Sequence, residues 1–395
     1  MLKNLIIISV SPIAIIFRLF NFRFLDVCHK DAIGHLTIEP FFYLNEYKNT
    51  EFSKFKVILA ISNKKIFNLF PKKISANKTI LQYWKQYFIV ISSPFLNILL
   101  TPIKKNPLVR INLRPYISDY WTNSKIFDII NRDNSPKYFF KLKKDQTKEK
   151  YLLSKLGIPK GAWYVCFACR EPGYYTQSNI NNTKCRCSDP KHLELAFHEI
   201  IKRGGWIIRL GSSKMEPLPK NLLKFKKVID YPKTEFVSDP MDVFLSATCR
   251  FFIGSSSGLL GLPLVFNVPL LLVNTIPICH SSFNKQDLVI FKLYQSKKIK
   301  KNIPFPEIVK TPSANYTKDK EFENDGIKLL ENSPEELRDA TIEMLNRLEG
   351  IQKYSEYEEK LQNKMLSLFK PNNFCYKTPV RFASSFLKKY SHLLE

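Results

Sequence analysis

Polar and charged residues follow five apolar segments in the second half of the 395-residue chain, and each segment has the length of a buried strand. The first segment is followed by Arg170, and the second carries Arg209 at its end and is followed by Gly211. Asp230 stands at the end of the third, Gly254–Gly258 follow the fourth and Asn274 follows the fifth. Parallel strands present their carboxyl ends at one edge of a sheet, where ligands bind. The spacing therefore predicts two arginines, a carboxylate and a Gly/Ser loop at a common edge.

The fourth segment runs into a loop of small residues, which are Gly254, Ser255, Ser256, Ser257 and Gly258. Glycines let the backbone approach a ligand closely, and N–H groups and hydroxyls before a helix can hold a phosphate. Arg170 and Arg209 could add bidentate contacts to a diphosphate. An ordinary strand-to-helix turn is the alternative. The loop is neither a Walker loop nor a Gly-x-Gly-x-x-Gly dinucleotide fingerprint.

In the first half, His35 follows Gly34 between the apolar segment Phe24–Val27 and a helical pattern over Phe41–Tyr47. A histidine at such a strand-to-helix turn lies at the edge where ligands bind, and its imidazole suits general-base catalysis near neutral pH. The alternative, which the sequence alone favours, is that His35 only caps or packs.

Four cysteines have spacings that call for a metal test, namely Cys166, Cys169, Cys185 and Cys187. A zinc site needs two pairs on turns that converge. Cys166 and Cys169 lie inside a predicted strand, where residues three apart face opposite sides, so we expect no metal. Eight cysteines are too few for a disulfide scaffold and favour a reducing cytoplasm.

The elements that would position these residues follow an α/β pattern. Apolar strand segments alternate with amphipathic helices in the second half, as in a parallel sheet covered on both faces. The predicted strands are 163–169, 206–210, 228–230, 250–253 and, as the last, 269–273. Predicted helices lie between them, and two more follow: one after the capping box at Ser333 and one over 354–369.

Domain boundaries are expected near a Lys-rich connector at residues 137–150. We predict an N-terminal Rossmann-like domain over 1–150, in which short apolar segments at 57–61, 88–91 and 108–112 alternate with basic loops. A nucleotide-binding Rossmann-like domain then spans 151–350, and a helical extension spans 351–395. The first 24 residues contain the apolar run Leu5–Phe17 between basic residues. This run is short for a membrane span, so it is either the first strand or a membrane-surface anchor.

The formal net charge is +26, which raises the question of a nucleic-acid partner. No familiar nucleic-acid module is present, so we expect none. The charge is uneven, because residues 319–359 hold 13 acidic and five basic side chains. A basic body suits an anionic ligand or an anionic membrane surface.

Several stretches resemble a family of bacterial glycosyltransferases from O-antigen and capsule gene clusters. The matching stretches, in chain order, are IGHLTIEP, CFACREPGYY, GGWIIRLGSSKMEPLP, VIDYP and SDPMDVFLSATCRFFIGSSSGLLGLPLVFNVPLLLVN with the following IP. The sequence departs from the family pattern at Ala32, where a basic residue is expected, and at Arg186-Cys187, where Arg-Asn is expected.

The resemblance implies a GT-B-like architecture, in which two doubly wound domains face a cleft. It places Arg170, Arg209 and Gly254–Gly258 near the diphosphate of a nucleotide-sugar donor, and Asp230 or Asn274 near the nucleoside. His35 becomes the expected base for the acceptor hydroxyl. No metal cofactor is implied, because helix dipoles and basic side chains offset the leaving diphosphate.

The expected function is transfer of a sugar to a glycan or lipid-linked glycan, in the cytoplasm or at the inner face of the plasma membrane. Two other functions stay open. One is a nucleotide-sugar epimerase or hydrolase on the same fold, which would consume donor without an acceptor. The other is a non-catalytic nucleotide-sugar-binding scaffold protein.

Overall fold

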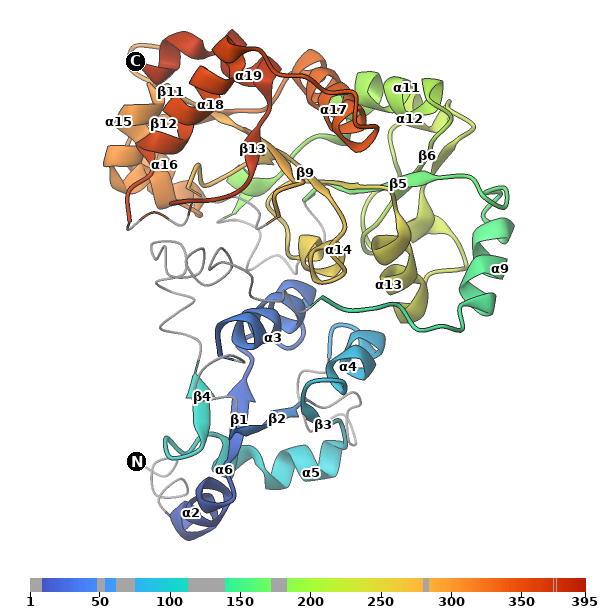
Figure 1. Ribbon diagram of the computed structural model, residues 1–395, viewed down its shortest axis with the longest axis vertical. Helices are drawn as coiled ribbons and strands as arrows, with labels where there is room; N and C mark the ends of the chain where they lie inside the picture. The colour runs from blue at the N-terminus through green and yellow to red at the C-terminus, as the bar shows by residue number, and fades with distance from the viewer. Residues whose placement is uncertain are drawn as a thin grey trace. The chain divides into compact units, whose positions relative to one another are not determined.

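The computed structural model describes residues 9–47, 54–61, 75–112, 139–171, 183–279, 284–371, 373 and 375–395. The chain divides into two compact units. Unit 1 comprises Met1–Tyr120 with Asn134–Phe140, and unit 2 comprises Trp121–Asp133 with Lys141–Glu395. Each unit is built around its own parallel sheet, so the α/β class predicted from the sequence is confirmed (Figure 1).

The sheet of unit 1 has four parallel strands in the order β3-β2-β1-β4. They are β1 (Phe22–Asp26), β2 (Lys56–Ala60), β3 (Ile89–Ile91) and β4 (Arg110–Asn112). All four coincide with apolar segments identified in the sequence. The strand order reverses between β1 and β4, so the carboxyl ends of these two strands form the edge where a ligand is expected.

Helices cover both faces of this sheet (Figure 1). They are α2 (Ser11–Leu19), α3 (Ile33–Tyr47), α4 (Lys78–Trp84), α5 (Pro94–Leu99) and α6 (Thr101–Lys104). On one face, Ala14 of α2 and Ile103 of α6 pack against Phe24 and Ile58 of the sheet. On the other, the indole of buried Trp84 donates a hydrogen bond to the Leu36 carbonyl, which joins α4 to α3.

The N-terminal segment resolves one of the open alternatives. Residues 11–19 form helix α2 and not a strand, and the first strand is β1 at 22–26. Pro12 stands in the first turn of α2, where its missing N–H costs no helical hydrogen bond. Residues 1–8 lie outside the described part. No helix among the described residues is long and apolar enough to cross a membrane.

Unit 2 contains seven parallel strands in the order β13-β10-β9-β8-β5-β6-β7. They are β5 (Tyr164–Ala168), β6 (Trp206–Arg209), β7 (Val228–Ile229), β8 (Phe252–Gly254), β9 (Leu270–Thr275), β10 (Leu288–Phe291) and β13 (Arg381–Phe382). The first five were predicted. The expectation that the fifth would be the last was wrong, because β10 pairs with β9 and the very short β13 pairs with β10.

The helices of unit 2 make the sheet doubly wound (Figure 1). On one side α11 (Glu194–Lys202) packs against α17 (Pro334–Leu348), and on the other α13 (Asp239–Thr248) packs against α14 (Gly261–Val265). The predicted capping box of α17 is present, since Ser333 and Glu336 exchange hydrogen bonds with each other's backbone N–H.

The remaining elements complete unit 2. An antiparallel pair, β11 (Leu293–Ser296) and β12 (Ile327–Leu330), follows β10. The last 45 residues contribute α18 (Glu356–Leu368), β13 and α19 (Ser384–Lys389), and α19 packs on α17. The other described helices are α9 (Thr147–Lys155), α12 (Lys220–Leu223), α15 (Phe305–Lys310) and α16 (Asp319–Asn324).

Candidate functional site

In unit 2 the strand order reverses between β5 and β8, which places the expected ligand edge at the residues that follow these two strands. The two loops are tied together there. The Arg170 backbone N–H donates to the Ser255 hydroxyl at 3.0 Å, and the Ser255 N–H approaches the Ala168 carbonyl at 3.4 Å. The structure thus brings Arg170 and the Gly/Ser loop to one place, as their positions after the first and fourth predicted strands indicated.

The serine hydroxyls of this loop form hydrogen bonds within the protein. The Ser256 hydroxyl donates to the Ile276 carbonyl at 2.7 Å and accepts from its N–H at 3.0 Å. The Ser255 hydroxyl accepts a hydrogen bond from the Arg170 N–H, and the Ser257 hydroxyl accepts one from the Leu259 N–H at 3.4 Å. The Ser256 hydroxyl is therefore engaged within the protein both as donor and as acceptor, whereas the Ser255 and Ser257 hydroxyls act as acceptors in these bonds.

The backbone of the same loop is in a different situation. In the part of the chain that the structure describes, the N–H groups of Ser256, Ser257 and Gly258 have no hydrogen-bond partner. They are consecutive and lie at the start of the helical residues Gly258–Val265. Consecutive N–H groups at such a turn form an anion-binding concavity. A Cβ at Gly254 would lie 2.4 Å from Leu260 Cδ2, so any larger residue there would require the Leu260 side chain to move.

Cationic side chains surround the loop. Arg186 Nε donates to the Ser256 carbonyl at 3.0 Å, and Arg170 donates to the Thr183 hydroxyl at 3.0 Å. The buried Lys292 ammonium donates to the Cys187 carbonyl at 2.5 Å. Arg186 and Lys292 were not identified from the sequence as site residues. Arg186 stands where the family pattern also has arginine, and this match could have identified Arg186 as a site residue from the sequence.

Arg209 has a role different from the expected diphosphate contact. It is 0% exposed, and its guanidinium donates to both carboxylate oxygens of Glu171 at 2.8 and 2.9 Å. It also donates to Asp230 Oδ1 at 3.2 Å and to the Glu216 carbonyl at 2.7 Å. Burial raises the pKa of Glu171, and the Arg209 charge opposes that rise. Arg209 therefore joins the ends of β5, β6 and β7 from inside.

The other predicted donor residues are likewise engaged within the protein. Asp230 Oδ2 accepts from the Leu218 N–H at 2.8 Å. Asn274 and Asn332 are buried and exchange amide hydrogen bonds, each backbone N–H donating to the other's Oδ1 at 2.7 Å. At Gly211 a Cβ would lie 2.5 Å from Met215 Sδ, so glycine is needed for close packing. Asp230, Asn274 and Gly211 thus make contacts within the protein next to the ends of the strands.

In unit 1 the predicted base His35 lies in the first turn of α3, after the carboxyl end of β1. Its Nδ1 lies 2.5 Å from Oε1 of Glu39, one helical turn later. Glu39 is buried, and its other oxygen accepts from the Cys28 N–H at 2.9 Å. The His29 ring packs edge-on against His35 with centroids 4.8 Å apart. A histidine held through Nδ1 by a buried carboxylate has the arrangement of a general base.

A group of charged residues lies beside this histidine at the edge of unit 1. Arg110 of β4 pairs with Asp26 of β1, with Nε to Oδ2 at 2.9 Å. Lys104 extends to the Ala60 carbonyl at 3.5 Å, and its pKa is lowered to about 8, first by burial and then by Lys30. An anionic ligand group here would relieve the repulsion between the two lysines.

The thiols of Cys166 and Cys185 face different parts of unit 2. The Cys166 thiol points to the Leu245 carbonyl at 3.4 Å, whereas the Cys185 thiol points to the Thr317 carbonyl at 3.4 Å. Within the described ranges no three His, Cys, Asp or Glu side chains are grouped so as to hold a metal ion.

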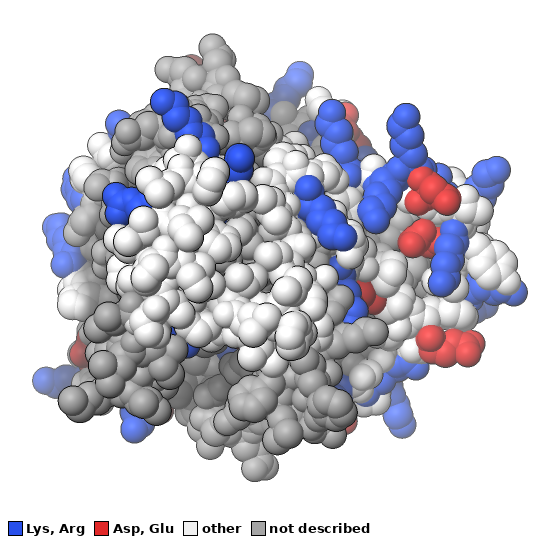
Figure 2. All heavy atoms as spheres, turned by 90° about the horizontal axis from the view of Figure 1, so that it is seen from below, with Lys and Arg blue, Asp and Glu red and all other residues white. Residues whose placement is uncertain are grey.

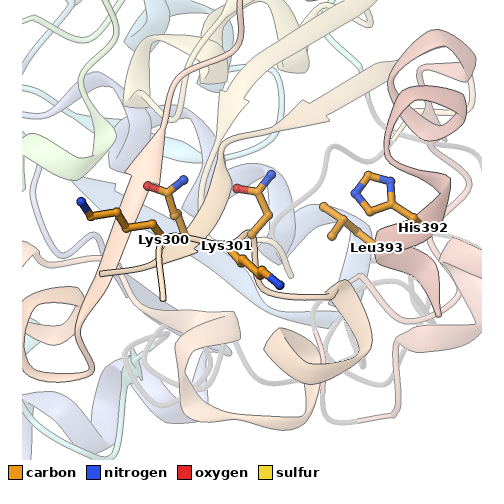
Figure 3. Close-up of a pocket in the computed structure, with 6 residues that line it drawn as sticks. Lys300, Lys301, His392 and Leu393 are labelled. Atoms are coloured by element: carbon orange, nitrogen blue, oxygen red, sulfur yellow. The ribbon is translucent and has the colours of Figure 1, made fainter. Parts of the chain in front are cut away.

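A hollow of about 350 Å³ lies in unit 2 (Figure 3). It is lined by Gln295, Lys300, Lys301, Asn302, His392 and Leu393. Figure 3 shows Lys300 and Lys301 on the segment after β11, across from His392 and Leu393 of the C-terminal turn. None of the predicted site residues lines it, so we place the candidate site at the sheet edges.

Comparison with known proteins identifies no family. No protein-family model matches the sequence, and no curated protein matches it. The ADP-heptose LPS heptosyltransferase II of E. coli is 11% identical over 64% of this chain and 84% of that chain, with a TM-score of 0.36. A family 9 glycosyl transferase of Veillonella parvula is 10% identical over 64% and 79%, with a TM-score of 0.38. E. coli heptosyltransferase WaaC with ADP-2-deoxy-2-fluoro heptose is 10% identical over 70% and 93%, with a TM-score of 0.32. Since these scores are below 0.5, the function has to be inferred from the chain's own residues.

Proposed function

We propose that this protein is a GT-B-type glycosyltransferase of surface-polysaccharide biosynthesis, which moves a sugar from a nucleotide-diphosphate donor to a glycan acceptor in the cytoplasm. The observation that carries the proposal is the row of N–H groups at Ser256, Ser257 and Gly258, which have no hydrogen-bond partner among the described residues and lie where the strand order of unit 2 reverses. The family resemblance of the sequence around this loop adds the reaction class.

Unit 2 binds the donor in this proposal. The three N–H groups donate hydrogen bonds to the diphosphate, and Arg170 and Arg186 both contact the loop that carries them, Arg170 through its backbone N–H and Arg186 through its side chain. Negative charge grows on the diphosphate as it leaves the sugar. Fixed N–H dipoles and guanidinium groups stabilise that charge in the transition state without having to reorganise. Arg209 acts indirectly, by holding Glu171 and Asp230 beneath the edge.

Unit 1 activates the acceptor. With Nδ1 of His35 engaged by Glu39, Nε2 is the atom that takes the proton of the acceptor hydroxyl as the new glycosidic bond forms. The sugar passes from the diphosphate oxygen to the acceptor oxygen, and the proton moves to His35. Lys30 and Lys104 give the acceptor side a positive potential, which suits an acceptor that carries a phosphate or a carboxylate.

The donor site is tested with uridine, guanosine and adenosine diphosphates by thermal shift and calorimetry. We expect one of them to bind the wild type. Gly258→Pro should weaken binding about tenfold or more, because it removes one N–H donor to a charged ligand. Gly258 begins a helical turn, and Ser257 before it has the extended backbone that precedes proline readily (φ −128°, ψ 147°).

Gly258→Ala is the matched control, since it alters the same residue but keeps the N–H. Equal binding by wild type and Gly258→Pro would remove the proposed diphosphate site, and so would the absence of binding by all three nucleotides. Donor consumption without any acceptor would identify an epimerase or hydrolase instead. Donor binding without turnover would identify a scaffold protein.

A further inference from the structure

Helix α5 presents its apolar side chains to solvent and its polar one to the protein. Phe95 is 63% exposed and Leu99 55%, whereas Asn97 is 3% exposed. The buried amide of Asn97 donates to the Ile91 carbonyl at 2.8 Å and to the Ser93 carbonyl at 2.9 Å. This is the reverse of the arrangement expected for a helix at a water-facing surface.

Helix α2 has the same character on its outer side. Ala14 is buried in the core of unit 1, and Phe17 packs against it. The opposite side of the helix carries Ile16, Leu19 and Phe20, and Leu19 is 74% exposed. An apolar stripe therefore continues around the helix far beyond the part that the core covers.

These two helices lie on the same side of the sheet. Helix α6 contacts both α2 and α5, and Ile103 of α6 shares the core cluster with Ala14 of α2. Figure 2 looks onto this side and shows a broad area without charged side chains, with Lys and Arg along its upper and right-hand margins and Asp and Glu farther to the right. We call this area, formed by the exposed apolar residues of α2 and α5, the apolar face. Contiguous exposed apolar area of this kind marks an interaction surface.

The charges around the apolar face are of one sign. Arg18 lies in the last turn of α2, Lys105 directly follows α6, and Lys56 lies with its ammonium 5.2 Å from the Phe22 ring. The sequence contains no Asp or Glu over residues 1–25 or over 52–118. A second copy docked on the apolar face through two-fold symmetry would place these cations opposite themselves, with no acid to offset them.

We propose that the apolar face docks unit 1 on an anionic phospholipid bilayer. The exposed side chains of α2 and α5 enter the boundary between headgroups and acyl chains, and Arg18, Lys56 and Lys105 contact the lipid phosphates. Apolar burial and attraction to anionic lipid act together in such surface-bound helices. This proposal does not depend on glycosyl transfer, because it concerns a surface and not the reacting groups.

The test is flotation of the purified full-length chain with vesicles, in the absence of any donor. One vesicle is phosphatidylcholine alone, and the other contains about one third phosphatidylglycerol. We expect binding to the anionic vesicles that weakens as salt is raised. The triple variant Leu19→Ser, Phe95→Ser and Leu99→Ser should bind at least tenfold more weakly.

The matched control replaces three exposed apolar residues of unit 2, Leu223→Ser, Ile299→Ser and Ile351→Ser, and should bind as the wild type does. All six side chains are exposed, so both variants should melt as the wild type does. Failure of the wild type to bind anionic vesicles would overturn the proposal, as would undiminished binding by the first triple variant. A wild-type dimer that this variant dissociates, without vesicle binding, would make the apolar face a self-association surface.

Discussion

Nδ1 of His35 lies 2.5 Å from Oε1 of Glu39, and the second oxygen of Glu39 accepts a hydrogen bond from the Cys28 N–H at 2.9 Å. The carboxylate thus fixes the imidazole to the loop that follows β1. Because Nδ1 is occupied, the ring can exchange a proton with a substrate only through Nε2. A buried carboxylate in this position also stabilises the imidazolium formed when the base takes a proton.

Replacing Glu39 by glutamine should therefore lower kcat while leaving donor binding intact. The expected loss is about 100-fold or more, which is the size of a general-base contribution. The measurement is sugar transfer over a range of pH, since loss of the carboxylate should also shift the pH dependence of kcat. Asp31→Asn removes an exposed carboxylate from the same loop and serves as the control. An unchanged pH profile in Glu39→Gln would show that Glu39 only supports the fold.

The sequence identified His35 but not Glu39, although the signal was available. A carboxylate four residues after a histidine lies on the same face of a helix, and the helix was predicted only from Phe41 onward, whereas α3 begins at Ile33. The first five strands of unit 2 were predicted, because continuous apolar runs bounded by glycine and polar residues have few other interpretations, but β10 was missed although it is also such a run. The strand β13 could not be predicted, since two residues carry no periodicity.

Arg209 shows a different limit. Its position at the end of a predicted strand was read correctly, but the sequence does not show that Glu171 and Asp230 converge on its guanidinium from two other strands. Pairing of this kind depends on the order of strands in the sheet. The same holds for α5, whose apolar residues suggest a core helix until the structure shows which side is buried.

The acidic residues of segment 319–359 form ion pairs, hydrogen bonds and helix caps within unit 2. Asp319 accepts from the backbone N–H groups of Lys184 and Cys185, and Glu349 pairs with Arg203 and Arg250. Other members cap helices or pair with the C-terminal lysines. The acidic residues thus offset cations of their own unit. The positive excess of unit 1 has no such partner segment in the sequence and is available to anionic ligands.

Replacing Arg209 by methionine should destabilise the protein more than it impairs catalysis directly. The partly buried carboxylates of Glu171 and Asp230 would remain without their cation, at a cost of up to about 3 kcal/mol of unfolding free energy. Denaturant unfolding at neutral pH measures this cost. The deficit should shrink below about pH 4, where the carboxylates take up protons.

Arg170→Met is the contrasting variant, because this side chain is only partly buried. It should change stability by less than about 1 kcal/mol and weaken nucleoside diphosphate binding. If Arg209→Met unfolds as the wild type does but loses nucleotide binding, Arg209 contacts the ligand directly.

The raised pKa of Asp242 should make the free energy of unfolding fall as the pH rises from acidic to neutral. Burial raises its pKa to about 7, while a hydrogen bond from the Tyr231 hydroxyl at 2.9 Å opposes the rise. Between the unfolded pKa of about 3.9 and this value, the folded protein holds a proton that the unfolded chain releases. The stabilisation is complete below pH 4 and is lost as the pH rises through 7.

Asp242→Asn should remove this pH dependence, because the amide oxygen still accepts from Tyr231 and carries no charge. At pH 8 the variant should be more stable than the wild type by about 2–4 kcal/mol, and at pH 4 the two should be alike. Parallel stability curves for the two proteins from pH 4 to 8 would contradict the assignment.

Lys104 should give the opposite pH dependence at the alkaline end. Its pKa is lowered to about 8 by burial, by Lys30 and by Lys105, while Asp26 opposes the shift. Below pH 8 both the folded and the unfolded chain carry the charge, and the folded state bears the cost of burying it. Between pH 8 and the unfolded pKa of about 10.4 the folded state gives up the proton first, so stability rises with pH. Lys104→Met should accordingly be more stable than the wild type at pH 7, by up to about 3 kcal/mol, and the difference should vanish near pH 10.5.

Inorganic phosphate adds a second readout, because an anion bound beside Lys30 and Lys104 favours the charged amine. It should raise the melting temperature of the wild type more than that of Lys104→Met, and an equal effect on both would exclude Lys104 from anion binding.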